Sequence, residues 1–509
     1  MKSNALLLPL TLLGLWTFLA PAAEKTSATR PNVLLICVDD LKPLLGCYGD
    51  RVVKSPNIDR LAARGLLFER AYCNQAVCAP SRNALLTGAR STTLGIYDLG
   101  TNFREAVPEA VTLPQYFKQQ GYRTEALGKI FHVGHGNHDD PASWTMPLWH
   151  AKMVAYAQKP ARGTNALTRE EARFSNVRPK AVEQLPRGPA YENLDVPDTV
   201  YPDGQIAEEA IRRLRATKQR PNEPFFLAVG FVKPHLPFCA PKKYWDLYDR
   251  ATFKPAARQT PPDGAPEYAP QFGGELRQYS DIPETGRLSE ELQRTLIHGY
   301  HAAVSYMDAQ LGRVLDELDR LGLGGNTIIV LWGDHGWHLG DHGMWCKHTN
   351  YEEAAHIPLL VVAPRVTKAG TRTTALVESI DLYPTLCELA GLAAPAAVVP
   401  QKIEGRSLVP VLRDPSVPTK EAIFHVYPRN PRGRGEILGR AIRTARYRLV
   451  EWKKPGAPAE TAELELYDYE ADPGETKNLA ATQPEVVSKL RAILASQPEA
   501  KAQIKAAAR

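Results

Sequence analysis

Cys78 is the residue of this 509-residue chain whose surroundings most clearly prepare it for chemistry. It is followed by Ala-Pro-Ser-Arg, and Pro80 suits the first turn of a helix because its fixed φ fits that turn. Gly88 marks the predicted end of this helix. The free N–H groups of a helix N-terminus favour an anion, and Arg82 can reach back toward the same anion. A cysteine in this position is first interpreted as a thiolate nucleophile.

Charged residues follow four apolar runs of the sequence at the point where each run ends. The pairs are Asp39 and Asp40, Lys129 and His132, Lys233 and His235, and Asp334 and His335. Because ligands of open α/β sheets bind at the carboxyl ends of the strands, we expect these pairs to lie close together. Clustered carboxylates at such an edge indicate an oxygen-rich site for a hard divalent cation.

A zinc site is a competing interpretation of the segment DHGWHLGDHGMWCKH, which begins at Asp334. On a helix, His338 and His342 would share a face, because they are four residues apart, and could bind one zinc ion. Asp341 or His348 would complete such a site. Three glycines within the segment disfavour a continuous helix and weaken this interpretation.

The elements that position these residues are predicted from apolar runs that alternate with amphipathic stretches. We predict an α/β fold in which a parallel or largely parallel sheet is covered on both faces by helices. The predicted strands are NVLLICV, YRTEALG, PFFLAVGFV, NTIIVL and IPLLVVAP, and further predicted helices span residues 58–64, 112–120, 205–218, 289–321 and 379–392.

The C-terminal part of the chain changes character. Short strands joined by Gly/Pro turns, with a helix over 484–494, indicate a smaller α+β subdomain at residues 401–509, beside a catalytic domain at residues 24–400. Two Pro-rich segments without clear periodicity, 139–201 and 254–286, are interpreted as insertions, and the first is expected to lie over the site.

The composition is that of an ordinary globular protein, with 44% hydrophobic and 23% charged residues. The formal net charge of +6 is mild for this length, and the sequence contains no basic tract, so nucleic acid is not an expected partner.

The N-terminus predicts export. Lys2 followed by an apolar run over residues 5–20 and by small residues predicts a secretory signal peptide over residues 1–23. An uncleaved membrane anchor is the alternative, although the run is short for a span. No later stretch is apolar for long enough to cross a bilayer, so we expect a periplasmic or secreted protein without a stable membrane span.

Seven cysteines are spaced widely and irregularly, which fits neither a disulfide framework nor a zinc pattern. If Cys78 is modified, six remain, and an exported protein could form one or two disulfides among them. The sequence does not pair them.

The stretch CAPSR from Cys78, followed by Leu-Thr-Gly, resembles the signature of the type I sulfatases. In that family the cysteine is oxidised to Cα-formylglycine, whose hydrated aldehyde is the nucleophile. The family usually has Lys or Arg directly after the glycine, whereas this chain has Ala89 followed by Arg90. The resemblance covers nearly the whole mature chain, including the phrases NVLLICVDD, GKIFHVG, KPHLPF and GDHGWHLGDHGMWCK. It implies an alkaline-phosphatase-like α/β sandwich with a C-terminal subdomain.

The resemblance also implies the residues of the site. It assigns one Ca²⁺ to Asp39, Asp40, Asp334, His335 and the modified Cys78. The catalytic set that it implies consists of Cys78, Arg82, Lys129, His132, His235 and Lys347, with cationic side chains around the sulfate. In this assignment His235, aided by Lys347, gives the proton to the leaving alcohol.

The implied activity is hydrolysis of a sulfate ester, most specifically the 2-O-sulfate of an iduronate residue in a sulfated glycan. A formylglycine-generating enzyme would be a partner during maturation. The alternatives are a sulfatase for another sulfated sugar, a phosphodiester or phosphonate monoester hydrolase of the same superfamily, and a sulfated-glycan binding protein without turnover.

Overall fold

An eight-stranded sheet forms the centre of the computed structural model, which describes residues 1, 30–158, 167–177, 179–272 and 274–504. The strands lie in the order β10, β2, β8, β7, β1, β5, β3, and β9 pairs with β2. Apart from Met1, the predicted signal peptide lies outside the described residues. The strand bounds are β1 Asn32–Val38, β2 Leu66–Tyr72, β3 Arg123–Gly128, β5 Phe225–Phe231, β7 Thr327–Gly333, β8 His356–Val362, β9 Thr371–Thr373 and β10 Val377–Glu378.

The prediction of a largely parallel sheet is confirmed. β1 is parallel to both of its neighbours, β5 and β7, and β3 is parallel to β5. β8 runs antiparallel to β7 and to β2, so the sheet is mixed on that side. β2 is not among the strands predicted above, because Glu69 and Arg70 interrupt its apolar run.

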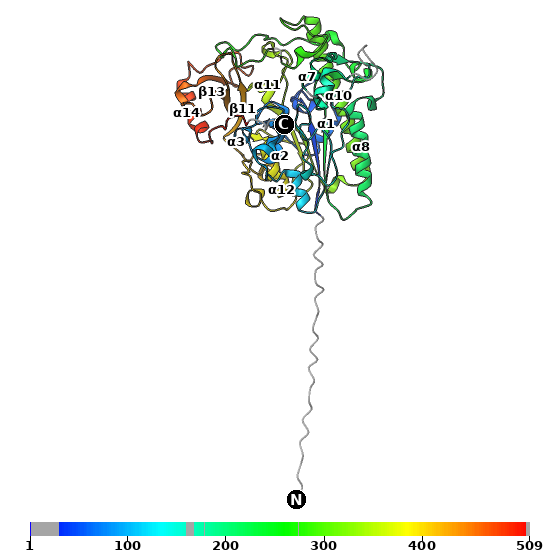
Figure 1. Cartoon of the computed structure of the whole chain (residues 1–509). Helices are drawn as coiled ribbons and strands as arrows, with labels where there is room; N and C mark the ends of the chain where they lie inside the picture. Colours follow the sequence, from blue (N-terminus) through cyan, green and yellow to red (C-terminus); the bar gives the residue numbers. More distant parts are fainter. Residues whose placement is uncertain (2–29, 159–166, 178, 273, 505–509) are drawn as a thin grey trace.

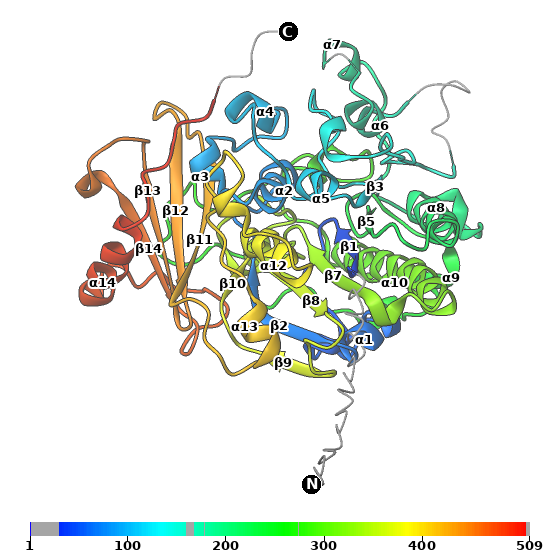
Figure 2. The same ribbon diagram turned by 90° about the horizontal axis from the view of Figure 1, so that it is seen from below.

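Helices cover both faces of the sheet, and the alternation along β1 shows how. Leu34 and Ile36 pack in one apolar cluster with α1, α8 and α10. Val33 and Leu35, which point to the other face, pack with α2, α5 and α12. Figure 2 shows these two groups of helices on opposite sides of the strands. The helices are α1 Pro56–Ala62, α2 Cys78–Thr87, α5 Leu113–Gln119, α8 Pro202–Thr217, α10 Glu290–Arg320 and α12 Leu382–Leu389.

A separate four-stranded antiparallel sheet follows near the C-terminus. Figure 1 shows it in orange and brown at one side of the main body. Leu490 and Leu494 of α14 pack on this sheet, which confirms the predicted α+β unit. The division of the chain at residue 400 stays a prediction. The elements are β11 Ala422–Arg429, β12 Ile437–Thr444, β13 Tyr447–Lys453, β14 Glu463–Asp468 and α14 Pro484–Ala495.

Shorter elements fill the connections between these layers. They are α3 Ser91–Leu94, α4 Phe103–Ala106, α6 Arg169–Phe174, α7 Pro179–Val182, α9 Lys242–Trp245, α11 Glu352–Ala355, α13 Val409–Arg413, β4 Tyr191–Glu192 and β6 Phe238–Cys239. Three of them, α6, α7 and β4, belong to the predicted insertion at residues 139–201, of which residues 159–166 and 178 fall outside the described part.

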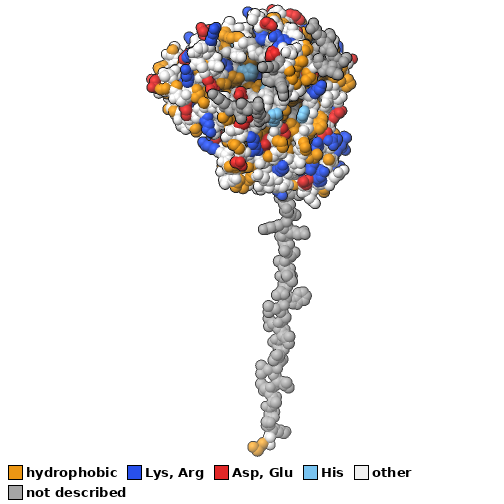
Figure 3. Space-filling model, in the orientation of Figure 1, with side chains coloured by type: hydrophobic (Ala, Val, Ile, Leu, Met, Phe, Trp, Pro, Cys, Tyr) orange, Lys and Arg blue, Asp and Glu red, His pale blue; other side chains and the backbone are white. Residues whose placement is uncertain are grey.

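The surface carries no single dominant charge on the face that Figure 3 shows. Figure 3 shows basic and acidic side chains intermixed on one face, in agreement with the mild net charge. Within the described ranges, no helix combines the length and the apolar character needed to cross a membrane.

All seven cysteines are described and free, so the disulfides considered above are not formed.

Arg448 on β13 ties the C-terminal sheet to the rest of the chain. Its side chain is 0% exposed and pairs with Glu475 at 2.7 Å and with Glu352 of α11 at 2.6 Å. This buried arginine couples the two parts, because Glu475 belongs to the C-terminal unit and Glu352 to the main body.

We expect Arg448→Met to lower the free energy of unfolding by about 3–5 kcal/mol, because it leaves the buried carboxylate of Glu475 without its counterion, while Glu352 keeps Arg443. Urea unfolding followed by circular dichroism measures this loss. Arg446→Met is the matched control, since Arg446 pairs with Asp468 near the same strand but is 44% exposed. The control should lose far less stability, because exposed pairs contribute little. Equal losses in the two variants would contradict the role given to Arg448.

Candidate active site

α2 begins at the cysteine that the sequence singles out. Val77, in an extended conformation, precedes the helix, and Gly88 ends it with a φ of 72°. This left-handed conformation suits glycine, and the predicted helix is confirmed. All residues of α2 are buried, so Cys78 is held by the core of the protein. After Gly88, Ala89 is buried and Arg90 forms ion pairs with Glu378 and Glu404.

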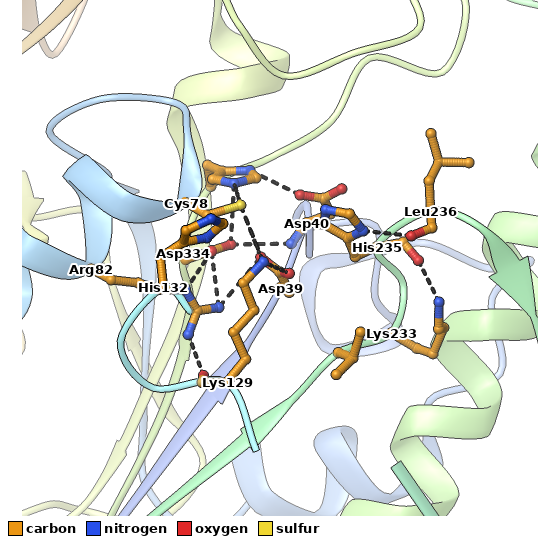
Figure 4. A network of polar contacts seen from close by, with 12 residues as sticks. Asp39, Asp40, Cys78, Arg82, Lys129, His132, Lys233, His235, Leu236 and Asp334 are labelled. Atoms are coloured by element: carbon orange, nitrogen blue, oxygen red, sulfur yellow. Dashed lines mark hydrogen bonds and ion pairs between the residues drawn. The ribbon is translucent and has the colours of Figure 1, made fainter. Parts of the chain in front are cut away.

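The thiol of Cys78 lies among charged groups from other elements (Figure 4). Its Sγ is 3.4 Å from Asp39 Oδ1, 3.3 Å from His335 Nε2 and 3.4 Å from Lys129 Nζ. Burial, and then the negative charge of Asp39, raises the pKa of this thiol well above its usual value. The unmodified side chain is therefore a neutral thiol, and the thiolate first inferred from the sequence does not fit these surroundings.

Three aspartates at the ends of neighbouring strands surround this thiol. Asp39 and Asp40 follow β1, and Asp334 follows β7, the parallel neighbour of β1. The N–H of Asp40 donates to Asp334 Oδ1 at 3.1 Å, and each of the three residues is at most 1% exposed. Burial, and then the negative charge of Asp39, raises the pKa of Asp334 to about 7. The carboxylates thus gather at one edge, as predicted.

Arg82 and Lys129 supply the positive charge that holds these carboxylates. Arg82 is 0% exposed, donates to Asp334 Oδ2 at 2.9 Å and lies 3.4 Å from Asp39 Oδ1. Lys129 Nζ contacts the other oxygen of Asp39. Burial alone would raise the pKa of Asp39, but these cations, together with His235, hold it well below its usual value. Arg82 is not among the described residues that line the pocket, so it acts on the carboxylates from within the core.

The donor atoms at this edge fit a divalent cation. One atom each of Asp39, Cys78, Asp334 and His335 lies within 4.8 Å of the others. Asp40 adds a buried oxygen, Oδ1, whose partner is the charge of Lys347 at 3.1 Å and which accepts no further hydrogen bond in the described part of the chain. Carboxylate oxygens are the preferred ligands of hard divalent cations, so this donor set agrees with the metal site predicted from the sequence.

Lys347 and His235 lie beside the aspartates and share a carboxylate partner. Lys347 Nζ is 3.1 Å from Asp40 Oδ1 and 2.6 Å from Glu275 Oε2. His235 Nε2 is 3.2 Å from Glu275 Oε1, and its Nδ1 is 2.5 Å from Leu236 O. Burial lowers the pKa of His235 to about 3, and the charge of Glu275 acts in the opposite direction. Two of the predicted residues, Lys347 and His235, are therefore brought together around the carboxylate of Glu275.

Two other predicted residues are placed differently. His132 lines the pocket, and its Nε2 is 3.1 Å from His135 Nδ1. Lys233 Nζ donates to the carbonyl oxygens of His235 and Pro237 at 2.6 Å, so it orders the loop after β5 (Figure 4). Its side chain does not join the charged cluster.

The alternative zinc site does not form. His338 Nε2 is 2.9 Å from the hydroxyl of Thr349, and its Nδ1 is 3.3 Å from Asp341. Among the described residues, His338 and His342 do not belong to any group of three potential ligands. The reason is the backbone, which makes a short 3₁₀ turn over Asp341–Gly343 instead of a continuous helix.

A cavity of about 190 Å³ lies beside Cys78. Both predicted insertions contribute to its wall, so the described part of the first one lies over the site, as predicted. The lining residues are Cys78, Leu99, His132, His135, Glu170, Arg173, Phe174, His235, Gln271, Gly274, Glu275, Gln278, Tyr279, Lys347 and His348.

Glu275 is the residue of this cluster that the sequence did not reveal. It belongs to a Pro-rich segment without periodicity, so no pattern distinguishes it from a surface glutamate. Its role depends on contacts with Lys347 and His235, which lie about seventy and about forty residues away in the sequence.

The chain belongs to the sulfatase family, whose model matches residues 31–392. It is therefore a sulfuric ester hydrolase, and sulfatases generally use a formylglycine made from cysteine together with a divalent metal ion. A second model, described as N-sulphoglucosamine sulphohydrolase, C-terminal, matches residues 340–500.

Within the family, the chain is similar to iduronate 2-sulfatase of Homo sapiens. The two are 37% identical over 481 residues, which cover 83% of this chain and 84% of the human protein. The chain also shares its fold with a protein solved in complex with its substrate D-glucosamine-2-N,6-O-disulfate. The TM-score is 0.70 at 23% identity, and the match covers 92% of this chain and 97% of that protein. The phosphonate monoester hydrolase of Agrobacterium radiobacter matches with a TM-score of 0.69 at 23% identity, over 92% of this chain and 95% of the hydrolase. These likenesses confirm the predicted alkaline-phosphatase-like fold.

We expect Glu275→Gln to lower kcat, because Lys347 and His235 lose the carboxylate that positions them. The same change removes a negative charge from the wall of the cavity beside Lys347 and His235, so inorganic sulfate should inhibit about 10-fold more strongly. Steady-state kinetics with sulfate as inhibitor measure both effects. Glu284→Gln is the control, because Glu284 belongs to the same insertion but is 77% exposed and pairs with Arg187. Unchanged kcat and unchanged sulfate inhibition in Glu275→Gln would remove Glu275 from the site.

Proposed function

We propose that this chain removes the 2-O-sulfate from an iduronate residue of a sulfated glycan, with a formylglycine made from Cys78. The observation that carries the proposal is Cys78 at the start of a buried helix, in contact with Asp39, His335 and Lys129, at the edge of a pocket. The similarity to human iduronate 2-sulfatase over most of both chains supports the uronate part.

Maturation and export belong to the same proposal. Cys78 is 2% exposed in the folded chain, so a formylglycine-generating enzyme would need to reach it before folding is complete. The predicted signal peptide would direct the chain out of the cytoplasm, to the periplasm or the medium. A sulfated glycan is the expected partner there.

Asp39, Asp40, Asp334, His335 and the modified Cys78 would hold one Ca²⁺. When bound, this ion supplies positive charge that stabilises the charge developing on the sulfate group. The protein's own contribution is to keep the carboxylates ionised, which Arg82 and Lys129 do for Asp39.

The proposed reaction has two steps at the residue 78 side chain. One hydroxyl oxygen of the hydrated aldehyde attacks sulfur and gives its proton to water, while the bond between sulfur and the sugar oxygen breaks. The second hydroxyl then gives its proton to water, the bond between carbon and the sulfate oxygen breaks, and sulfate leaves with the electron pair. The aldehyde forms again and water restores the hydrate. Lys129 and His132 would steady the hydrate during both steps.

His235 would donate the proton that the leaving sugar oxygen needs, with Lys347 beside it. Burial disfavours the protonated ring, which is why the pKa of His235 falls to about 3. A bound sulfate ester adds a negative charge to this pocket, and that charge favours the protonated form together with Glu275. Proton donation is therefore expected from the substrate complex and not from the free protein.

We expect Cys78→Ala to abolish turnover while preserving the fold, because alanine suits a helix start. Mass spectrometry of the wild-type peptide that contains residue 78 should show formylglycine in active protein. Cys387→Ala is the control, since Cys387 is equally buried but belongs to α12, away from the pocket. Full activity of Cys78→Ala would end the nucleophile assignment.

We expect Ca²⁺ to raise the unfolding temperature of chelator-treated protein, because binding at 100 times its Kd stabilises the folded state by about 2.7 kcal/mol. Asp40→Asn should weaken this response. Asp341→Asn, beside His338, should leave it unchanged. Metal analysis accompanies the melts. Stoichiometric zinc in active protein, or an undiminished Ca²⁺ response of Asp40→Asn, would contradict the proposed site.

The substrate is tested by comparing kcat/KM for four esters. These are a 2-sulfated iduronide, 6-sulfated N-acetylglucosamine, a simple aryl sulfate and a phosphonate monoester. We expect the iduronide to be hydrolysed with the highest kcat/KM, because only it carries both the sulfate and the uronate carboxylate. Preference for another sulfate would leave a sulfatase of different specificity, and preference for the phosphonate would overturn the proposed activity.

A further inference from the structure

Glu170, Arg173 and Gln278 are polar side chains of the pocket wall that have no role in the proposed reaction. Glu170 and Arg173 belong to α6, in the first insertion, and Gln278 belongs to the second. All three line the cavity that Cys78 also lines. They are thus in reach of the sugar that carries the sulfate.

Glu170 and Gln278 each have a side-chain oxygen without a hydrogen-bond partner. Glu170 is 4% exposed, and its Oε2 accepts from the N–H of Gly188 at 2.9 Å. Its Oε1, and Oε1 of Gln278, are buried and accept no hydrogen bond in the described part of the chain. A buried polar atom left unpaired costs about 1–3 kcal/mol, so these two oxygens are suited to donors that a ligand supplies. The hydroxyls of a sugar are such donors.

Arg173 is a cation that the protein satisfies only weakly. The ion pair found for it among the described residues is with Glu183, at 3.6 Å. The Glu183 side chain is 65% exposed and that of Arg173 is 27% exposed, so water competes for this pair. A planar guanidinium in this state can bind a carboxylate with two parallel hydrogen bonds.

The position of α6 relative to the reacting groups is fixed by packing. Thr168 and Glu171 form a capping box at its start. At its end, the ring of Phe174 lies 5.7 Å from that of His235, and Lys129 Nζ lies 5.4 Å from the centre of the Phe174 ring. The N–H of His135 donates to the carbonyl oxygen of Arg173 at 3.0 Å. Arg173 is therefore held next to the residues proposed to bind sulfate.

We propose that Arg173, Glu170 and Gln278 form the wall that recognises the sugar ring. Arg173 binds the carboxylate of the uronate, and Glu170 and Gln278 accept hydrogen bonds from its hydroxyls. The assignment rests on the proposed function, because it takes the substrate to be a sulfated uronide.

The test uses a pair of substrates that differ only at the carboxylate. One is the 2-sulfated iduronide, and the other is the same sugar with its carboxylate reduced to a hydroxymethyl group. Arg173→Gln should lower kcat/KM for the first by about 10-fold or more, since a hydrogen bond to a charged group contributes about 1.5–3 kcal/mol. It should leave kcat/KM for the second nearly unchanged. Arg173→Lys should recover part of the loss.

One control and one further variant of the wall separate recognition of the sugar from general damage to the protein. Arg187→Gln changes an arginine of the same insertion that pairs with Glu284 and does not line the pocket, so both substrates should be unaffected. Gln278→Met should raise KM for both sugars and leave hydrolysis of a simple aryl sulfate unchanged, because an aryl sulfate has no ring hydroxyls.

The outcomes distinguish the two proposals. A wild-type protein that does not prefer the iduronide to the aryl sulfate defeats the proposed function. The recognition proposal alone is defeated by a different result. In that case the wild-type protein prefers the iduronide, but Arg173→Gln lowers kcat/KM equally for the uronide and for its reduced form. If Arg173→Gln lowered kcat/KM more for 6-sulfated N-acetylglucosamine than for the uronide, Arg173 would bind a second sulfate, and the carboxylate assignment would be overturned.

Discussion

Three buried carboxylates at the ends of β1 and β7 are the constraint on which the rest of the site depends. Burial, and then the charge of neighbouring carboxylates, raises the pKa of such groups, as it does for Asp334, and positive charge brought to them acts in the opposite direction. α2 brings this positive charge and also positions the proposed nucleophile. Cys78 and Arg82 are one turn apart on this helix, and Arg82 pairs with Asp334 while Cys78 contacts Asp39. A shift of α2 would therefore disturb the carboxylates and the reacting side chain together.

The strands and the insertions contribute different properties. Parallel strands end at one edge of the sheet, and their registers fix the charged residues that follow them. The insertions add the walls, which determine what can bind there. Glu275 connects the insertions with the charged edge, because it belongs to an insertion and contacts Lys347 and His235 of the charged cluster. A change of substrate can thus arise in the insertions while the charged edge stays the same.

The sequence predicted the elements with strong periodicity and the residues that follow them. β1 is a continuous apolar run and α2 has a proline in its first turn and a glycine after its end, so both were located correctly. β2 was missed because charged side chains interrupt it. The partners of Glu170 and Glu275 could not be predicted, because their contacts depend on how two aperiodic segments fold over the sheet. Arg82 was expected to face an anion in the pocket, and the structure shows instead that its anions are aspartates of the protein.

The same burial that makes Cys78 unreactive as a thiol suits the modification proposed for it. A thiol at 2% exposure beside Asp39 keeps its proton, so it is a poor nucleophile and its soft sulfur is a poor ligand for a hard cation. An aldehyde hydrate at this position would present two oxygens to the carboxylate-rich edge, next to Lys129. Oxygen donors match the ligand preference of hard divalent cations, and the attack on sulfur proposed for a hydrate hydroxyl needs no thiolate. The surroundings of Cys78 are thus better suited to the oxidised side chain than to the encoded one.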